Sequence, residues 1–265
     1  MKLHRHVVAC GGSHYTVITL RPGAYARFSD NYYHGTWHIL SDWHGTRILG
    51  RLLWGLAYQR VPGTLVLIDR PQLDPSPFNG EPADPIALVP SQLTSLSARA
   101  ARELRARLPL TQPAGTVRWQ TRGLDLAIAA GGSRAARWRD RRPDANRITR
   151  SGGLITFAGT PNVLRQWAVA VYQRGEYCSP EGMDHLFLGD GSCWADGEVQ
   201  IFRDYRRRVS AAAQARREIL ATIPPQLPPS NVEPLIWERG ASIRRRNRNG
   251  QRDTDCGRGI LLLPP

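Results

Sequence analysis

The stretch "YYHGTWHILSDWHGTR", Tyr32–Arg47, contains the tripeptide His-Gly-Thr twice, ten residues apart. A further histidine, His38, and a carboxylate, Asp42, lie between the two copies. Imidazole and carboxylate groups are the side chains that bind transition metals and transfer protons near neutral pH. The first question is therefore whether this stretch is a metal or catalytic centre.

The spacing argues for structural histidines. If His34 and His38 share a strand, their Cα atoms lie ~13 Å apart at ~3.3 Å per residue. Zinc binds its nitrogen ligands at only ~2 Å, so this pair should not share one ion. His38 and His44 could converge beside Asp42, but no spacing here matches a known ligand motif. We expect no metal site, a helix capped by Ser41 or Asp42, and His44 in its first turn.

An acidic segment is the second candidate for chemistry. Residues 176–198 carry six acids and no arginine. Such carboxylates could hold Mg²⁺ beside a phosphorylated substrate. Mg²⁺ is the only cofactor that the sequence suggests. Under that hypothesis the candidate catalytic residues are Asp42, His44, Asp184 and His185. The alternative is a pair of Asp-Gly turns with solvated acids. The spacing of Cys178, His185 and Cys193 fits no zinc finger or ribbon.

The stretch "GLITFAGTPNVLRQW" is typical of a strand, a tight turn and a helix. Gly159 permits the turn, Thr160 is a good N-cap, and Pro161 suits the first helical position. A helix start can hold an anion through its free N–H groups. The candidate anion-binding residues are Gly159, Thr160, Asn162 and Arg165. The glycine pattern and lysine of a phosphate-binding loop are missing.

Arginine dominates the charge balance. The chain has 36 basic and 22 acidic residues, a net charge of +14, and its only lysine is Lys2. Arginine-rich codon usage would raise the arginine count without explaining the lack of acids. Because the guanidinium fork pairs well with phosphate, we expect a polyanionic partner such as nucleic acid; a merely solvated basic surface is the alternative. The candidate contacts are Arg137, Arg139, Arg141, Arg142, Arg206, Arg207, Arg208, Arg244, Arg245, Arg246 and Arg248.

The elements that must position these residues follow from periodicity. Two strand-like runs flank "GGS" near the start, which predicts a hairpin. The runs "TLVLIDR" and "IALVP" are typical of buried strands. Apolar residues at a spacing of three and four predict helices after Asp42, after Pro90, after Thr160 and over residues 199–223. We expect an α/β (or α+β) core domain over 1–223, with a mixed sheet flanked by helices. A Pro-rich linker, 224–234, and a basic C-terminal arm, 235–265, should follow, and Asn249-Gly250 suggests a hairpin in that arm.

Composition narrows the class of protein. No apolar run approaches the ~18 residues that span a bilayer. The amino terminus has too few apolar residues for a signal peptide, and four cysteines are too sparse for a disulfide scaffold. We expect a soluble, cytoplasmic protein without a membrane partner.

Three functions stay open. The first is binding of nucleic acid or another polyanion through arginine-rich faces. The second is an enzyme acting on a phosphorylated nucleotide or nucleic-acid substrate. The third is a protein-interaction or scaffold component. The enzyme hypothesis would be favoured if His38, Asp42, His44, Thr160 and Asp184 lined one cleft.

Overall fold

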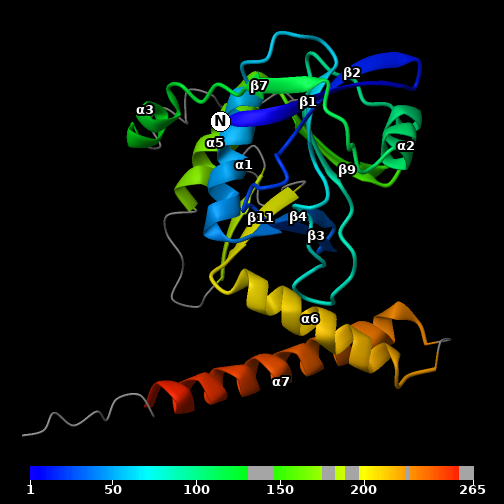
Figure 1. The fold of residues 1–265 in the computed structure, drawn as a ribbon, viewed down its shortest axis with the longest axis vertical. Helices are drawn as coiled ribbons and strands as arrows, with labels where there is room; N and C mark the ends of the chain where they lie inside the picture. The colour runs from blue at the N-terminus through cyan, green and yellow to red at the C-terminus, as the bar shows by residue number, and fades with distance from the viewer. Residues whose placement is uncertain (131–145, 175–182, 189–196, 225–226, 257–265) are drawn as a thin grey trace, which may run out of the picture. The chain divides into compact units, whose positions relative to one another are not determined.

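The computed structural model describes residues 1–130, 146–174, 183–188, 197–224 and 227–256, with side chains described as far as residue 247. Contacts divide the chain into two units. Unit 1 comprises Met1–Asp74 and Ala83–Arg203, and unit 2 comprises Pro75–Pro82 and Asp204–Pro265. The predicted α/β fold with mixed sheets flanked by helices is confirmed (Figure 1).

Unit 1 is built on a seven-stranded mixed sheet, in the order β7-β1-β2-β5-β6-β9-β8. Strands β2 and β5 and strands β6 and β9 pair in parallel, and the other neighbours are antiparallel. The predicted hairpin joins β1 and β2. Every residue of β5 and β6 is buried, as their unbroken apolar sequences predict. The strands are β1 (Lys2–Cys10), β2 (Ser13–Thr19), β5 (Thr64–Ile68), β6 (Ile86–Pro90), β7 (Gly115–Arg118), β8 (Asn146–Ser151) and β9 (Leu154–Gly159).

Helices cover both faces of this sheet. On one face α1 (Trp43–Leu56) packs against α5 (Pro161–Arg174), and α3 (Leu124–Ala129) contacts α5 (Figure 1). On the other face α2 (Ala98–Ala106) closes a second apolar cluster. A Cβ on Gly50 would lie 2.8 Å from the Ala168 carbonyl oxygen, so glycine permits the close approach of α1 to α5. The short apolar run after Gly123 fits a strand or a helix by sequence, and it is the helix α3.

A second, four-stranded sheet in unit 1 has the order β10-β11-β4-β3. Its strands are β3 (Phe28–Tyr33), β4 (Thr36–Ser41), β10 (Met183–Phe187) and β11 (Gly197–Phe202). Two predictions were wrong here. The stretch "RPGAYARFSDN", residues 21–31, has the proline and glycine of a loop, but its last four residues pair with β4. The segment 199–202 was expected as helix but pairs in parallel with β4. Pairing in this sheet buries Val199 and Ile201, which outweighs the local helical pattern.

Unit 2 contains two helices, α6 (Tyr205–Leu220) and α7 (Pro229–Cys256). The predicted hairpin at Asn249-Gly250 was wrong, because both residues lie within α7. The end of the predicted linker is also helical, since α7 begins at Pro229. Val232, Ile236 and Ile243 recur at helical spacing and pack with Ala211 and Ala215 of α6. Among the helices of the described residues, none is both long and apolar enough to cross a membrane.

Candidate nucleic-acid interface

The two helices of unit 2 hold most of the predicted arginines that the structure describes. Small residues on α6 allow α7 to lie close: a Cβ on Gly240 would be 3.8 Å from the Ala215 Cβ. The segment Pro75–Pro82 also packs on α6, and a Cβ on Gly80 would lie only 2.7 Å from the Ala212 carbonyl oxygen. These close contacts fix which face of α6 is turned to solvent.

The arginines of unit 2 fall into two groups, and the first group is paired with acids. Arg208 Nε donates to the Asp204 carboxylate at 2.5 Å, and Arg239 Nε donates to Glu218. Arg216 lies 3.5 Å from Glu81 and donates to the Asn79 carbonyl oxygen. Half-exposed ion pairs of this kind contribute ~0–1 kcal/mol each. Arg208, predicted as a nucleic-acid contact, therefore already has an acidic partner within its own helix.

The second group points outward. Arg206, Arg207 and Arg217 are exposed. At 100° per residue, Arg206 and Arg217 share one stripe of α6 with Ser210 and Gln214, and Arg207 lies at its edge. Over eleven residues this stripe is ~16 Å long at 1.5 Å per residue. We call these five residues the α6 stripe.

One acid, Glu218, borders the α6 stripe, because Gln214 of the stripe donates to its carboxylate at 2.8 Å; among the described residues no acid forms an ion pair with Arg206, Arg207 or Arg217. The two acids of the segment 204–220 are Asp204 and Glu218, and both bond to arginines. The hydrogen bond from Arg239, with a second from Gln214, lowers the pKa of the Glu218 carboxyl. Glu218 thus stays ionised and its charge is offset by Arg239. The three arginines of the stripe therefore present positive charge that no ion pair among the described residues offsets.

The carboxyl half of α7 adds further basic residues. Arg245 and Arg246 are exposed, whereas Arg244 is half-buried. Trp237 is 41% exposed, two turns before this cluster on the same helix. An exposed indole is a surface on which a nucleic-acid base can stack. The side chain of Arg248 lies outside the described residues.

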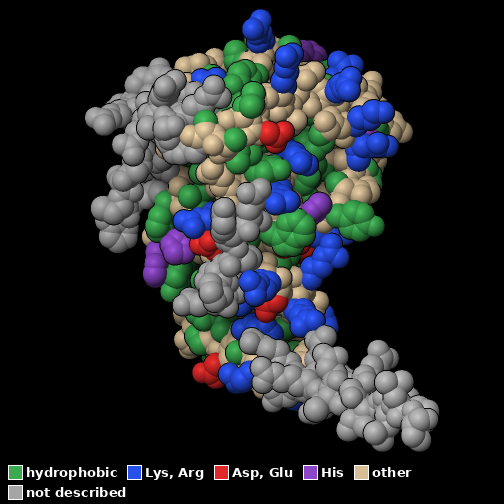
Figure 2. Space-filling view, turned by 90° about the vertical axis from the view of Figure 1, so that its left-hand side faces the viewer, with side chains coloured by type: hydrophobic (Ala, Val, Ile, Leu, Met, Phe, Trp, Pro, Cys, Tyr) green, Lys and Arg blue, Asp and Glu red, His purple; other side chains and the backbone are tan. Residues whose placement is uncertain are grey.

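The remaining predicted arginine cluster, Arg137, Arg139, Arg141 and Arg142, also lies outside the described residues. Elsewhere the basic side chains are spread out: Figure 2 shows Lys and Arg scattered over the visible face among apolar and neutral side chains. Net charge alone therefore does not mark a site; the α6 stripe is distinguished by three exposed arginines on one helix that form no ion pair within the described residues.

The predicted anion site at the start of α5 is built as a helix cap. Thr160 is buried, and its hydroxyl accepts the Val163 N–H at 3.4 Å. Ser91 N–H donates to the Gly159 carbonyl oxygen at 3.0 Å. Arg165 donates to Asn162 and stacks on Tyr58, 5.4 Å from the ring centroid. These contacts explain the four residues as structural elements, and anion binding by them stays a prediction.

The two His-Gly-Thr copies have different structures. In the first, His34 and Gly35 have φ of 51° and 79° and form the two-residue turn between β3 and β4. In the second, Asp42 caps α1 by accepting the Gly45 N–H at 2.7 Å, and His44 lies in the first turn. The Asp42 cap and the place of His44 are confirmed. His34 and His38 do not share a strand, because the chain reverses between them.

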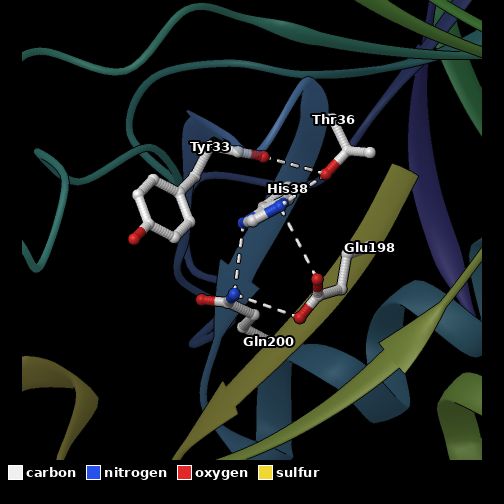
Figure 3. A network of polar contacts seen from close by, with 5 residues as sticks. All are labelled: Tyr33, Thr36, His38, Glu198 and Gln200. Atoms are coloured by element: carbon white, nitrogen blue, oxygen red, sulfur yellow. Dashed lines mark hydrogen bonds and ion pairs between the residues drawn. The ribbon is translucent and has the colours of Figure 1, made fainter. Parts of the chain in front are cut away.

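His38 is the centre of a buried polar network on the second sheet (Figure 3). Gln200 Nε2 donates to His38 Nδ1 at 3.1 Å and to Glu198 at 3.0 Å. His38 Nε2 lies 2.8 Å from the Thr36 hydroxyl and 3.6 Å from the Glu198 carboxylate. Since the Thr36 hydroxyl donates to the Tyr33 carbonyl oxygen, it accepts from His38, whose Nε2 carries the proton.

Burial lowers the pKa of His38, although the Glu198 carboxylate acts in the opposite direction. His38 is 2% exposed, so its ring is neutral and closed to a substrate. We conclude that this network orders the sheet. Sequence alone did not point to Glu198 and Gln200 as partners of His38, because parallel pairing of β4 with β11 brings them together.

The predicted catalytic residues have different surroundings. Asp184 and His185 are consecutive on β10, so their side chains point to opposite faces. Asp184 lies 3.3 Å from Arg174, and His185 is exposed. Asp42 caps α1, and His44 lines a cavity. Catalysis by these four residues stays a prediction. Within the described part of the chain, no three His, Cys, Asp or Glu side chains are placed to hold a metal ion.

The candidate contacts predicted from the sequence did not include Ser210, Gln214 and Arg217 of the α6 stripe or Trp237 of α7. Trp237 would have been found if the arm had been interpreted as a helix, since Val232, Ile236 and Ile243 show helical periodicity.

No protein-family model matches this chain, and neither the curated proteins nor the solved structures contain a match.

Proposed function

We propose that the protein binds nucleic acid through the α6 stripe, assisted by Trp237, Arg245 and Arg246 of α7. The observation that carries this proposal is the sorting of arginines on α6. Arg208 and Arg216 are each paired with a carboxylate, whereas Arg206, Arg207 and Arg217 face solvent and form no ion pair with an acid of the described residues.

The chemistry of the stripe suits a phosphate backbone. Guanidinium groups form paired hydrogen bonds with phosphate oxygens, and Ser210 and Gln214 can donate further hydrogen bonds to the backbone. None of these groups is arranged to read a base edge. We therefore expect electrostatic binding that depends little on sequence.

Salt dependence provides the test. Binding of the full chain to a fluorescein-labelled single strand and to a duplex is measured by anisotropy over a series of NaCl concentrations. The triple variant Arg206→Gln, Arg207→Gln, Arg217→Gln should weaken binding and flatten the salt dependence. Three lost phosphate contacts reduce the slope of log K against log salt by ~2 for a single strand and ~3 for a duplex.

A matched control separates this site from general charge. Arg60, Arg118 and Arg122 are exposed arginines of unit 1, and their replacement by glutamine removes the same charge. This control should retain most of the salt slope. Equal losses in the two triple variants would mean that net charge, not the stripe, binds nucleic acid. No complex with either probe at low salt would refute the proposal.

A further inference from the structure

A cavity of about 590 Å³ lies in unit 1, away from the His38 network. It is lined by the start of β1, the loop that follows β2 and the first turns of α1. Four basic residues contribute to its wall: Lys2, His4, Arg21 and His44. Among the described residues that line it, none is acidic. Its volume falls within the ~300–1,000 Å³ that is usual for small-molecule sites.

The wall of the cavity is divided into an apolar and a basic part. Met1, Ala24 and Ile48 are half-buried and give the apolar part. Lys2 and Arg21 are exposed at its edge, as is Tyr25, which is 75% exposed. A ligand that matched this wall would carry an apolar body and a negative charge at one end.

The loop that carries Arg21 and Tyr25 is held in place. The Arg21 carbonyl oxygen accepts the Ala24 N–H and the Gln72 side-chain amide, both at 2.9 Å. Gln72 is 3% exposed, and its own carbonyl oxygen accepts the Phe28 N–H at 2.8 Å. Because these bonds fix the loop before any ligand arrives, little ordering is needed on binding.

We propose that this cavity binds a small molecule that combines a flat ring with a phosphate group, of the nucleoside monophosphate class. Arg21 offers a planar fork to two phosphate oxygens. The ring lies against the half-buried Ala24 and Ile48, with the Tyr25 ring available for stacking. This site uses none of the residues of the α6 stripe, so either proposal can fail without the other.

The test is calorimetric titration of the full chain with adenosine monophosphate, and separately with adenosine and with inorganic phosphate. We expect saturable binding of one adenosine monophosphate per chain, with each half of the molecule bound at least about tenfold more weakly. Arg21→Ala should weaken the nucleotide by about tenfold or more. Tyr25→Ala should weaken adenosine monophosphate and leave inorganic phosphate unchanged.

Arg60→Ala is the matched control, because Arg60 is an exposed arginine of unit 1 that does not line the cavity. It should bind adenosine monophosphate like the unaltered chain. Thermal unfolding of each variant checks that it folds. The proposal is overturned if adenosine monophosphate shows no saturable binding, or if Arg21→Ala and Arg60→Ala bind it equally.

Discussion

The buried imidazole of His38 makes a prediction about acid stability. Burial lowers its pKa below the ordinary value of 6.5, so the folded protein holds the ring neutral. In the unfolded chain the ring takes up a proton at about its ordinary pKa. Well above pH 6.5 the ring is neutral in both states, and its burial costs no proton. As the pH falls from 6.5 towards the lower pKa of the folded state, the unfolded chain alone takes up a proton, so the free energy of unfolding decreases.

The magnitude follows from proton linkage. One proton bound by the unfolded state alone costs ~1.4 kcal/mol of unfolding free energy per pH unit. His6 is also buried, with its pKa lowered by burial, so the two rings together can cost up to ~2.8 kcal/mol per unit in this window. Domains have only ~5–15 kcal/mol of stability, so one pH unit is a large perturbation.

The assay is urea unfolding at a series of pH values below and above 6.5. His38→Gln should lower the unfolding free energy at pH 8, because Thr36 and Gln200 lose their ring partner, but it should flatten the pH dependence by up to ~1.4 kcal/mol per unit. Thr36→Val is the matched control. It removes the hydrogen bond to Nε2, costs ~1 kcal/mol, and leaves the titrating ring in place, so its pH dependence should be retained.

The opposite sign would refute this reasoning. If the unaltered chain gained stability as the pH fell from 7 to 6, and His38→Gln removed that gain, the ring would be protonated in the folded state. Its contact with Glu198 at 3.6 Å would then be a charged pair that outweighs the effect of burial.

Three further predictions concern the opening stretch, and urea unfolding measures each. Asp42→Ala should lower the free energy of unfolding by ~1 kcal/mol, because it removes the hydrogen bond that caps the Gly45 N–H, whereas Asp42→Asn should keep most of this stability. Equal losses in the two variants would show that the cap is unimportant. Gly45→Ala should cost at least ~2 kcal/mol, because the new Cβ would lie 1.9 Å from Ser41 Oγ, while Gly23→Ala, with no atom within 4 Å, should be nearly neutral. His34→Asn should raise the free energy of unfolding by ~0.5 kcal/mol, because asparagine tolerates the positive φ of this turn better than histidine does. A loss of stability would mean that stacking of the His34 ring on Tyr33 stabilises the turn by more than the backbone strain costs.

Local signals in the sequence predicted the elements that depend on local chemistry. Asp42 and Thr160 were identified as caps because a short polar side chain before an apolar helical stripe satisfies free backbone N–H groups. Strands β5 and β6 were identified because an unbroken apolar run needs burial on both faces. None of these inferences needed knowledge of a distant partner.

Elements that depend on distant partners could not be predicted in this way. The sequence "FSDNYY" of β3 is polar, and it is a strand because β4 pairs with it. In α7 the local Asn-Gly turn signal is outweighed by the burial of Val232, Ile236 and Ile243 against α6. The sequence also could not predict which arginines of unit 2 pair with acids and which face solvent. For example, the carboxylate beside Arg216 belongs to Glu81, which is distant in the sequence.

The contact between Arg216 and the segment Pro75–Pro82 has a consequence for synthesis on the ribosome. Arg216 follows its hydrogen-bond partner Asn79 by 137 residues. At ~5–20 residues per second, the segment emerges roughly 7 to 27 seconds before α6 can reach it. Its prolines, Pro75, Pro77 and Pro82, fix φ and reduce the number of conformations that it samples during that wait. The segment Pro75–Pro82 is therefore restricted in conformation in the nascent chain before α6 is synthesised and packs against it.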